Sequence, residues 1–486
     1  MTKKVAIVFC KSLKAKLLFR LLLMLILTSG QLALAGGFAL SGVGSKAIGM
    51  GGAFRGLADD WSAAYWNPAG LTQLEQSELN GMLVAITPKV EYNPNITYGG
   101  IDIGYRNGST RYPNEKSIFI PDFSGFFRLN AVKDYTVGLA IFVPYGLGSE
   151  WDLMNPIGRD LAHEFPFHDH ESKLAIIDFH PTVAKSFSDG KFSVGAGLSI
   201  QRGSITFHKT YLSPSGLPIP HENLYVDSEM EGTGWGFGAN FGLLYKMSDK
   251  LRLGLSGKTG GKISFDGTST QELYTLENPG LQDILLGNAT SAIDSAQIYY
   301  LFALENHLAE PDASGDLKLP ADFGLGLAYK PNSKLTLTGE VAYTMWSALD
   351  QIELDLTGTD LRGLPMDTTS VIFLDWENTL RISLGAEYWV REPLAIRLGY
   401  YLDPTPIPDK TFSPLIPDVG DKNSFNIGAA LRFSGLELSY NFEYISFKDR
   451  DVSALEDANS DGAFDNYPGL FKMSLYASHA SVTYRF

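Results

Sequence analysis

The sequence predicts an all-β fold, a transmembrane antiparallel β-barrel of about 14 strands. Three observations predict it. From about Glu78 to Phe486, apolar and polar residues alternate in bursts of roughly ten residues. The connections between bursts are short and long in turn. The last burst, Tyr476-Ala-Ser-His-Ala-Ser-Val-Thr-Tyr-Arg-Phe486, places apolar residues on one face and polar residues on the other, as a strand does. A barrel dissolved in lipid requires this combination.

Residues 1–35 are predicted to be a secretory signal peptide. Lysines and one arginine form a positive region, Leu21–Thr28 is the apolar core, and Ala33-Leu-Ala35 is a small-residue cleavage site. The alternative, a transmembrane anchor, is disfavoured because the apolar core is too short to span a bilayer. The only cysteine, Cys10, lies in this segment, so we expect no disulfide in the mature chain.

The composition excludes several classes of protein. A net charge of -15 argues against a nucleic-acid partner. Beyond residue 35 no run of about 18 apolar residues could span a membrane as a helix. No phosphate-binding GxxxxGK[ST] loop is present, so any transport is expected to be passive. We expect no cofactor, no bound metal and no catalytic site, and therefore not an enzyme.

Residues 36–76 are predicted to plug the barrel that residues 77–486 form. This segment is rich in Gly, Ala and Ser and shows no strand alternation. The lumen of a barrel of about fourteen strands is too wide for wall side chains to fill. A chain of small residues can thread such a lumen without overpacking it.

Two sets of strands are predicted, running in opposite directions. The upward strands lie near 78–92, 134–147, 191–208, 250–265, 333–354, 393–402 and 436–450. Their downward partners lie near 116–129, 172–187, 232–247, 316–330, 371–390, 424–433 and 470–486. Alternation is plain in Leu380/Ile382/Leu384 and in Leu394/Ile396/Leu398. An even number of strands returns both chain ends to the periplasmic side.

The connections fall into two classes. Hairpin turns are predicted at Ser188-Asp-Gly190, Met247-Ser-Asp-Lys250, Pro331-Asn-Ser333, Arg391-Glu-Pro393 and Ser434-Gly435. The other connections are long polar loops, the longest near 266–315. Short turns at one rim and long loops at the other are typical of outer-membrane barrels and are not explained by a soluble propeller or sandwich. Within the longest loop, 281–286 and 292–303 read as short apolar helices that either pack on the rim or receive an apolar ligand.

The segment from Gly49 to Leu71 resembles the N-terminal hatch of the FadL/TodX family of outer-membrane transporters of hydrophobic compounds. The specific part is Asn67-Pro-Ala69 followed by Gly70-Leu71, placed after a Gly-rich run and Ala58-Asp-Asp60. The resemblance continues in Val143-Pro-Tyr-Gly-Leu-Gly-Ser-Glu-Trp151, Arg397–Pro408, Ser413–Asp418 and Phe425–Gly428. It therefore extends over the whole mature chain.

The resemblance implies a side exit through the barrel wall. In the family, one strand kinks inward and opens a hole that touches the hatch. Carried over to this chain, Pro144, Tyr145 and Gly146 are the kink, and Asn67, Pro68 and Ala69 are the hatch gate. Pro144 lacks a ladder donor and Gly146 permits unusual backbone angles, which favours a bend here. The alternative is a strand that simply ends early.

The implied function is passive uptake of hydrophobic molecules, above all long-chain fatty acids, captured at the extracellular loops and released laterally through the kink opening. Aromatic hydrocarbons are the alternative substrate, and a non-specific porin and an outer-membrane hydrolase are rival functions. We expect outer-membrane lipid and lipopolysaccharide as surroundings, the outer-membrane assembly machinery as a partner of the C-terminal Phe486, and a monomer in the outer membrane of a Gram-negative bacterium.

Weaker signals remain open. Arg202, His208 and Lys209 either offer a cation to a carboxylate or are solvated rim charges. The run Asp457-Ala-Asn-Ser-Asp-Gly462 with Asp465 matches the first half of a calcium loop, but Pro468 stands where Glu is required, so a solvated turn is the alternative. His163-Glu164 and His168-Asp-His-Glu171 read as a hydrated loop rather than a metal site.

Overall fold

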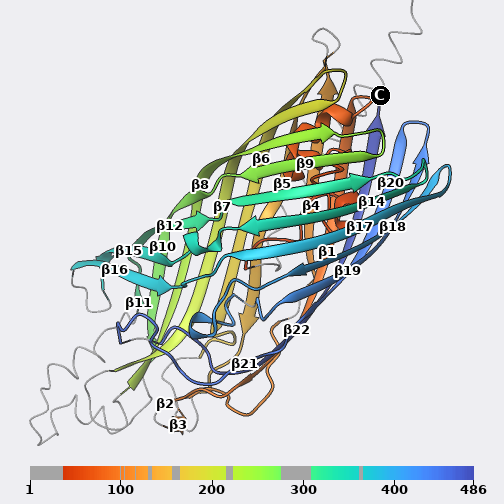
Figure 1. The fold of residues 1–486 in the computed structure, drawn as a ribbon. Coiled ribbons are helices and arrows are strands. Elements are labelled where there is room, and N and C mark those ends of the chain that lie inside the picture. Colours follow the sequence, from red (N-terminus) through yellow and green to blue (C-terminus); the bar gives the residue numbers. More distant parts are fainter. Residues whose placement is uncertain are drawn as a thin grey trace, which may run out of the picture.

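One large antiparallel sheet closes into a barrel (Figure 1). The computed structural model describes residues 37–98, 100–102, 104–114, 117–129, 134–155, 165–214, 223–274, 308–360, 365–416, 418–462 and 464–486. The predicted signal peptide and the predicted loop helices at 281–286 and 292–303 lie outside these residues.

The sheet contains twenty assigned strands. Several of them are collinear pieces of one span, so together they form fourteen spans of the barrel wall. The upward strands are β1 (Glu78–Pro94), β5 (Tyr135–Trp151), β7 (Phe192–Pro214), β9 (Leu251–Lys258) with β10 (Gly261–Tyr274), β14 (Leu335–Thr344) with β15 (Gln351–Thr359), β18 (Leu394–Asp403), and β20 (Leu436–Phe447) with β21 (Arg450–Val452). The downward strands are β4 (Ile118–Arg128), β6 (His170–Phe187), β8 (Asn223–Lys246), β12 (Asp312–Leu319) with β13 (Asp322–Tyr329), β16 (Pro365–Phe373) with β17 (Thr379–Arg391), β19 (Lys422–Phe433) and β22 (Gly469–Arg485). The short strands β2 (Thr97–Tyr98) and β3 (Ile101–Asp102) pair with each other, and β11 (Leu308–Ala309) pairs with β10.

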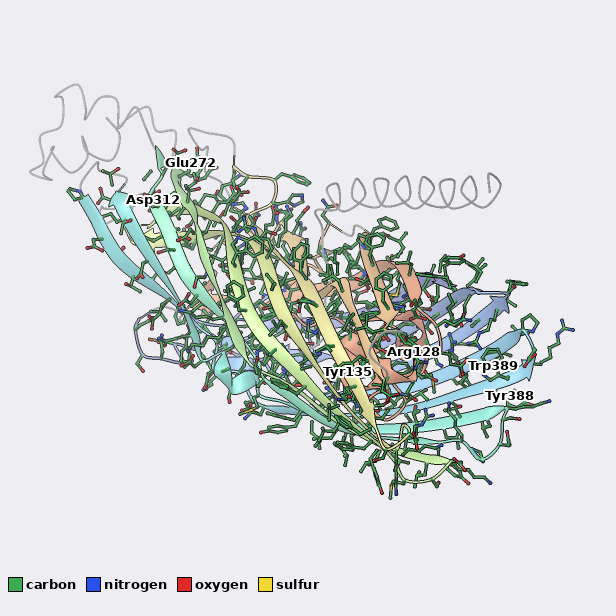
Figure 2. All side chains as sticks on the ribbon, turned by 90° about the horizontal axis from the view of Figure 1, so that it is seen from above. Arg128, Tyr135, Glu272, Asp312, Tyr388 and Trp389 are labelled. Carbon is green, nitrogen blue, oxygen red and sulfur yellow. The ribbon has the colours of Figure 1, made fainter. Side chains whose placement is uncertain are left out.

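The sheet presents its apolar side chains outward. On β17, Leu380, Ile382 and Leu384 are exposed, whereas Thr379 and Ser383 are buried on the inner face. In a soluble protein the apolar side chains face inward, so this arrangement is reversed. It suits a wall whose outer face contacts lipid. Side chains at the two ends differ (Figure 2): Arg128, Tyr135, Tyr388 and Trp389 lie toward the short-turn end, and Glu272 and Asp312 toward the long-loop end. Aromatic residues at a barrel rim are typical of the membrane interface.

The first and last strands close the barrel. β1 and β22 pair along their whole lengths, from Glu78 opposite Arg485 to Pro94 opposite Gly469. The Phe486 amide donates to the Ser77 carbonyl oxygen at 2.9 Å, which fixes the C-terminus at the base of β1. The predicted antiparallel barrel of about fourteen strands is therefore confirmed.

Five predicted strands are interrupted, which corrects the expectation of unbroken spans. The spans predicted near 250–265, 316–330, 333–354 and 371–390 break between β9 and β10, β12 and β13, β14 and β15, and β16 and β17. The span predicted near 436–450 breaks between β20 and β21. Pro320 lies in the second break and cannot donate to a ladder. In the third and fourth breaks the chain turns Trp346 of η2 (Trp346–Ala348) and Trp376 into the interior, where both are nearly fully buried.

Residues 37–76 pack against the inner face of the sheet. They contain α2 (Ser45–Gly49), α3 (Ala63–Trp66) and η1 (Pro68–Gln73), and η3 (Asp409–Thr411) lies in a later loop. Ile48, Phe54, Leu57 and Leu71 are completely buried. In Figure 1 this orange segment lies within the ring of strands. Among the described residues, no helix is long and apolar enough to cross a membrane.

Candidate functional site

The ladder between β4 and β5 ends halfway up the wall. These two strands pair only from Arg128 opposite Thr136 to Phe123 opposite Ile141. β4 nevertheless continues up to Ile118 alongside β1, and β5 continues up to Trp151 alongside β6. The two strands therefore separate above Phe123. Near the top of β5, the Asn114 amide, just before β4, donates to the Glu150 carbonyl oxygen at 3.0 Å.

A bulge in β5 marks the point of separation. Opposite β6, the register shifts between Phe142 and Tyr145, so that Val143 and Pro144 together oppose one residue. The burial pattern records the extra residue: Ala140 and Phe142 are buried below it, and Leu147, Ser149 and Trp151 are buried above it. The buried positions thus change from even to odd numbers. A bulge bends its strand and re-aims the side chains beyond it. This bulge consists of Val143 and Pro144, so of the predicted kink residues it includes Pro144 alone.

The N-terminal segment occupies the edge of β5 that β4 leaves free. The Leu40 amide donates to the Pro144 carbonyl oxygen at 3.0 Å, and the Gly146 amide donates to the Phe38 carbonyl oxygen at 2.8 Å. Ala39 lies opposite Tyr145 in an antiparallel bridge. Residues 38–40 thus act as a short substitute strand, because backbone groups at this buried edge need partners.

Phe38 anchors this substitute strand. Its ring centre lies 5.6 Å from that of Tyr145, 5.3 Å from that of Trp346 and 5.6 Å from that of Trp376. The two tryptophans come from the breaks that interrupt the β14–β15 and β16–β17 spans. Burying a phenylalanine side chain is worth about 1.5–3 kcal/mol. The contact between residues 38–40 and β5 is therefore firm but within reach of a competing apolar ligand.

Asn67, Pro68 and Ala69 lie against a different part of the wall. The Asn67 side-chain amide donates to the carbonyl oxygens of Arg55 (2.8 Å) and Leu243 (3.0 Å), and its oxygen accepts from the Ala69 amide (3.2 Å). A Cβ at Gly195 would lie 2.3 Å from the Pro68 carbonyl carbon, so this glycine is required for the close approach. On the side of the bend, the Tyr65 ring contacts the Phe142 ring at a centroid distance of 5.5 Å.

Replacing Asn67 with Ala is expected to loosen residues 57–75. The substitution removes the bonds of Asn67 to the Arg55 carbonyl oxygen, the Leu243 carbonyl oxygen and the Ala69 amide. A buried polar group left without a partner costs roughly 1–3 kcal/mol. Amide hydrogen exchange in this segment should become at least about tenfold faster. Asn332→Ala, which removes a capping oxygen at an exposed turn, is the matched control and should leave that exchange unchanged. Equal exchange in all three proteins would contradict the role assigned to the Asn67 amide.

Buried charges hold the segment to the wall. Glu340 of β14 accepts from the backbone amides of Phe54 (2.9 Å) and Arg55 (2.8 Å) and from the Arg55 guanidinium, which also pairs with Asp322. Lys46 pairs with Asp59 at 2.7 Å and lies 3.5 Å from Glu387. Burial alone would lower the pKa of the Lys46 ammonium, but these two carboxylates raise that pKa above its ordinary value.

Two small cavities lie on either side of Tyr145. One has a volume of about 70 Å³ and the other about 30 Å³, and Tyr65, Tyr145 and Lys258 line both. Sites for drug-sized ligands have volumes of about 300–1,000 Å³. Neither cavity therefore accommodates an acyl chain in this conformation.

Three cations that sequence reasoning did not single out, Arg55, Lys258 and Arg381, line the larger cavity together with Asp322 and Asp403. Arg55 is already paired with Glu340 and Asp322. The Lys258 Nζ lies 3.1 Å from the centre of the Tyr65 ring. The Arg381 guanidinium stacks on Tyr401 at 3.8 Å and donates from Nη1 to the Ser41 carbonyl oxygen at 3.2 Å. Its Nε and Nη2 atoms are buried and have no hydrogen-bond partner among the described residues.

The cations that the sequence did suggest lie elsewhere. Arg202 points outward, with its guanidinium 5.3 Å from the ring centre of the exposed Trp235. His208 is hydrogen-bonded to Asp227 at 2.6 Å, and the Lys209 Nζ lies 5.5 Å from the Tyr467 ring centre. Of the three, none lines either cavity at Tyr145.

In the suggested calcium loop, carboxylates accept hydrogen bonds from backbone amides of the same loop. Asp457 accepts from the amides of Asp461 (3.1 Å) and Gly462 (2.9 Å), and Asp465 accepts from that of Ala458 (2.8 Å). Among the described residues, no group of three or more His, Cys, Asp or Glu side chains is placed to hold a metal ion. His163 and Glu164 lie outside the described residues.

Comparison with known proteins places the chain among outer-membrane proteins. The sequence model of the family described as "Outer membrane protein transport protein (OMPP1/FadL/TodX)" matches residues 26–486. The chain is 24% identical over 412 residues to the long-chain fatty acid transport protein of Escherichia coli, covering 79% of this chain and 81% of that protein. It shares the fold of a Pseudomonas aeruginosa FadL homologue (TM-score 0.72, 23% identity, 93% of this chain and 100% of that one) and of the Pseudomonas putida toluene transporter TodX (TM-score 0.66, 15% identity, 92% and 99%).

Proposed function

Because the chain belongs to the OMPP1/FadL/TodX family of outer membrane transport proteins, we propose that it takes up hydrophobic molecules, most of all long-chain fatty acids, by passive transport. The protein is an outer-membrane β-barrel. Its short turns then face the periplasm and its long loops face the cell exterior. The 36–76 segment serves as the hatch, and the 77–486 barrel forms the wall.

The separation of β4 from β5 supports lateral release above all other observations. Above Phe123 the two strands share no ladder, and residues 38–40 cover the free edge of β5. A substrate from the loops reaches Phe38, replaces its contacts with Trp346 and Trp376, and leaves between the two strands into the bilayer. Apolar surface gains about 25 cal/mol per Å² when it leaves water, so no other energy source is needed. Pro144, Tyr145 and Gly146 form the lateral opening. The gate residues Asn67, Pro68 and Ala69 anchor the hatch on its lumenal side.

The lumenal cations favour a substrate that carries a carboxylate. Arg381 and Lys258 line the larger cavity, and two nitrogens of Arg381 lack partners among the described residues. A buried guanidinium with free donors suits bidentate binding of a carboxylate. A related E. coli protein is named for long-chain fatty acid transport. An aromatic hydrocarbon, the cargo in the name of the P. putida structure, would leave these donors unpaired.

Arg381→Gln is expected to separate the two substrate classes. A hydrogen bond to a charged group is worth about 1.5–3 kcal/mol, so oleate uptake at low concentration should fall about tenfold or more. Toluene uptake should stay at the wild-type level. Arg432→Gln, which changes a half-exposed arginine near the short-turn end, is the control. Uptake should be measured into proteoliposomes for both compounds. Equal losses for oleate and toluene, or no loss at all, would reject the fatty-acid assignment.

The rival functions make different predictions in the same proteoliposomes. A non-specific porin would admit sugars and cause swelling, and an outer-membrane hydrolase would cleave lipid. We expect neither. The buried 37–76 segment argues against an open pore, because Gly195, Gly242 and Gly254 hold the wall in contact with it. Swelling in sugars without oleate or toluene uptake would favour the porin.

A further inference from the structure

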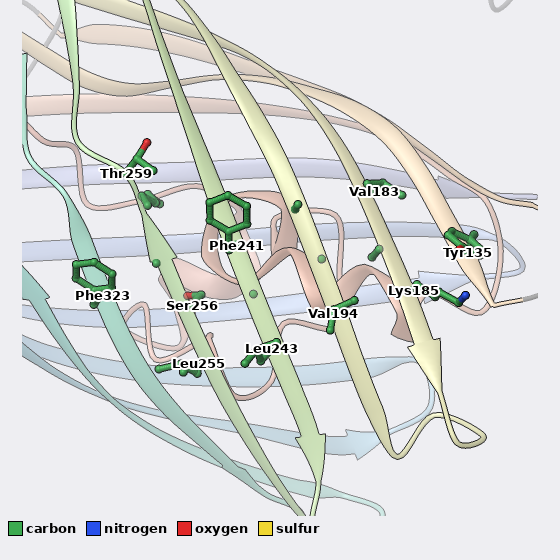
Figure 3. Close-up of a pocket in the computed structure, with 16 residues that line it drawn as sticks. Tyr135, Val183, Lys185, Val194, Phe241, Leu243, Leu255, Ser256, Thr259 and Phe323 are labelled. Atoms are coloured by element: carbon green, nitrogen blue, oxygen red, sulfur yellow. The ribbon is translucent and has the colours of Figure 1, made fainter.

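A groove indents the lipid-facing side of the barrel near its short-turn end. It has a volume of about 730 Å³, and its walls are apolar side chains of β6, β7, β8, β9 and β13, namely Val183, Val194, Phe241, Leu243, Leu255 and Phe323. We call it the outer groove. Figure 3 shows these side chains on neighbouring strands, with Tyr135 and Lys185 toward one end. Phe241, Leu243, Leu255 and Phe323 are each 41–56% exposed, so the groove opens outward.

The indentation follows from the packing of the inner face. A Cβ at Gly242 would lie 2.0 Å from the Asn67 Oδ1, and one at Gly254 would lie 1.9 Å from the Arg55 carbonyl oxygen. These strands therefore approach the hatch as closely as their backbones allow. On the outer face, small residues form the floor between larger ones, Ala196 on β7 and Gly257 on β9. The groove is thus built by residues on both faces of the wall.

A lysine lies at the β6 edge of the groove, where Lys185 is paired in register with Val194 of β7. The Lys185 Nζ lies 4.6 Å from the Tyr135 ring centre and 4.9 Å from the Phe187 ring centre. Among the described residues it forms no ion pair, whereas Lys246, also near a short turn, pairs with Asp249. An ammonium flanked by aromatic rings at a membrane interface attracts a negatively charged group, and its apolar stem stays in the lipid.

We propose that the outer groove binds an anionic phospholipid of the periplasmic leaflet. The phosphate contacts Lys185 and the Tyr135 hydroxyl, and an acyl chain lies along Val194, Leu243 and Phe241. Two observations select this occupant. Lys185 is three residues from the Ser188–Gly190 turn, and the large outward-facing side chains that line the groove are apolar. The polar lining residues Ser256 and Lys258 contact the hatch on the inner face. The volume falls in the range of about 300–1,000 Å³ of specific ligand sites. The bound lipid packs behind the wall that Asn67 and Pro68 contact from inside.

The test is native mass spectrometry of the full mature protein released from detergent, with phosphatidylglycerol or phosphatidylethanolamine of identical chains. The wild type should retain at least about tenfold more phosphatidylglycerol, as expected for a charge-assisted contact. Lys185→Ala should lower phosphatidylglycerol retention to the phosphatidylethanolamine level. Ala196→Phe, which fills the floor, should remove both adducts. Heat-modifiable electrophoretic mobility verifies that each variant is folded.

Two matched variants lie on β1, outside the groove. Lys89→Ala removes a lysine that lies 5.5 Å from the Tyr476 ring centre, and Ala85→Phe enlarges an outward alanine on β1. Both should retain wild-type lipid. Equal retention of the two lipids by the wild type, or unchanged retention in Lys185→Ala and Ala196→Phe, overturns the proposal. If the two groove variants lose an oleate adduct but keep phosphatidylglycerol, the groove holds transported substrate and the lipid proposal fails. Oleate uptake should remain normal in Lys185→Ala, so failure here is distinguishable from failure of the transport function.

Discussion

Deletion of Pro144 is expected to abolish uptake of oleate while the barrel still assembles. The deletion removes the extra residue of the bulge, so β5 regains a one-to-one register with β6. The bulge adds one residue to β5, which is why the buried positions are even-numbered below it and odd-numbered above it. Deleting one residue moves Leu147, Ser149 and Trp151 back by one position, so all three still face inward. The straightened strand can then continue its ladder with β4 above Phe123, which closes the wall. Gly146→Val should act in the same direction through the same backbone.

Uptake of radiolabelled oleate into cells, with heat-modifiable mobility as the measure of assembly, tests this prediction. Pro181→Ala on the neighbouring strand β6 removes a proline that lies opposite Leu139 in the regular part of the ladder, and it should transport normally. We expect uptake by the deletion variant to fall to the level of cells without the protein. Normal uptake by a folded deletion variant would exclude the wall opening at β5 as the exit.

A disulfide between Ala39→Cys and Tyr145→Cys is expected to block uptake reversibly. The flanking hydrogen bonds, from Leu40 to Pro144 and from Gly146 to Phe38, make Ala39 and Tyr145 a non-hydrogen-bonded pair. Such pairs have Cα atoms about 4.5 Å apart, within the range a disulfide accepts. The cross-link holds Phe38 against the bend, so a substrate cannot displace it. Cys10, in the predicted signal peptide, is the only native cysteine and does not compete.

Uptake by the oxidised double variant should be at least about tenfold below that of the same protein after reduction. The control is a pair at Leu438 and Val482, which lie opposite each other on β20 and β22. Its cross-link joins two strands that do not need to move, so oxidation should leave uptake unchanged. Equal uptake before and after reduction in the Ala39–Tyr145 variant would show that residues 38–40 do not gate transport.

The periodicity of the sequence predicts most of the wall. Alternation such as Leu380/Ile382/Leu384 identifies both the strand and its lipid face, because lipid rewards apolar residues at every second position. The turn at Ser188–Gly190 is equally local, and all three residues adopt positive φ. Such features depend only on neighbouring residues, and the structure confirms them.

Contacts between distant residues could not be predicted from periodicity. Nothing near Trp346 or Trp376 in the sequence indicates that both leave the wall to surround Phe38. Likewise, the pairing of residues 38–40 with Pro144–Gly146 depends on how the segment folds in the lumen. Local chemistry at Pro144 predicts a bend, but not the segment that covers it.

The inward orientation of Arg381 could be predicted from the sequence, but the lack of hydrogen-bond partners for two of its nitrogens among the described residues could not. Arg381 lies between Leu380 and Ile382, so alternation alone assigns it to the inner face. The same reasoning assigns Arg397, between Ile396 and Leu398, to the inner face, where it pairs with Glu387 at 2.8 Å. The sequence could therefore identify inward cations. It could not show that Arg397 is paired while two nitrogens of Arg381 are not, because this depends on partners across the lumen.

Photolabelling tests the lateral route most directly. A fatty acid with a diazirine in its acyl chain, irradiated during uptake, should label peptides on both sides of the separated strands, around 118–123 of β4 and 141–147 of β5. The Ala39–Tyr145 cross-link should suppress the label. Labelling confined to inward residues at the short-turn end, with the β4 and β5 peptides unmarked, would mean that substrate passes straight through the lumen to the periplasm.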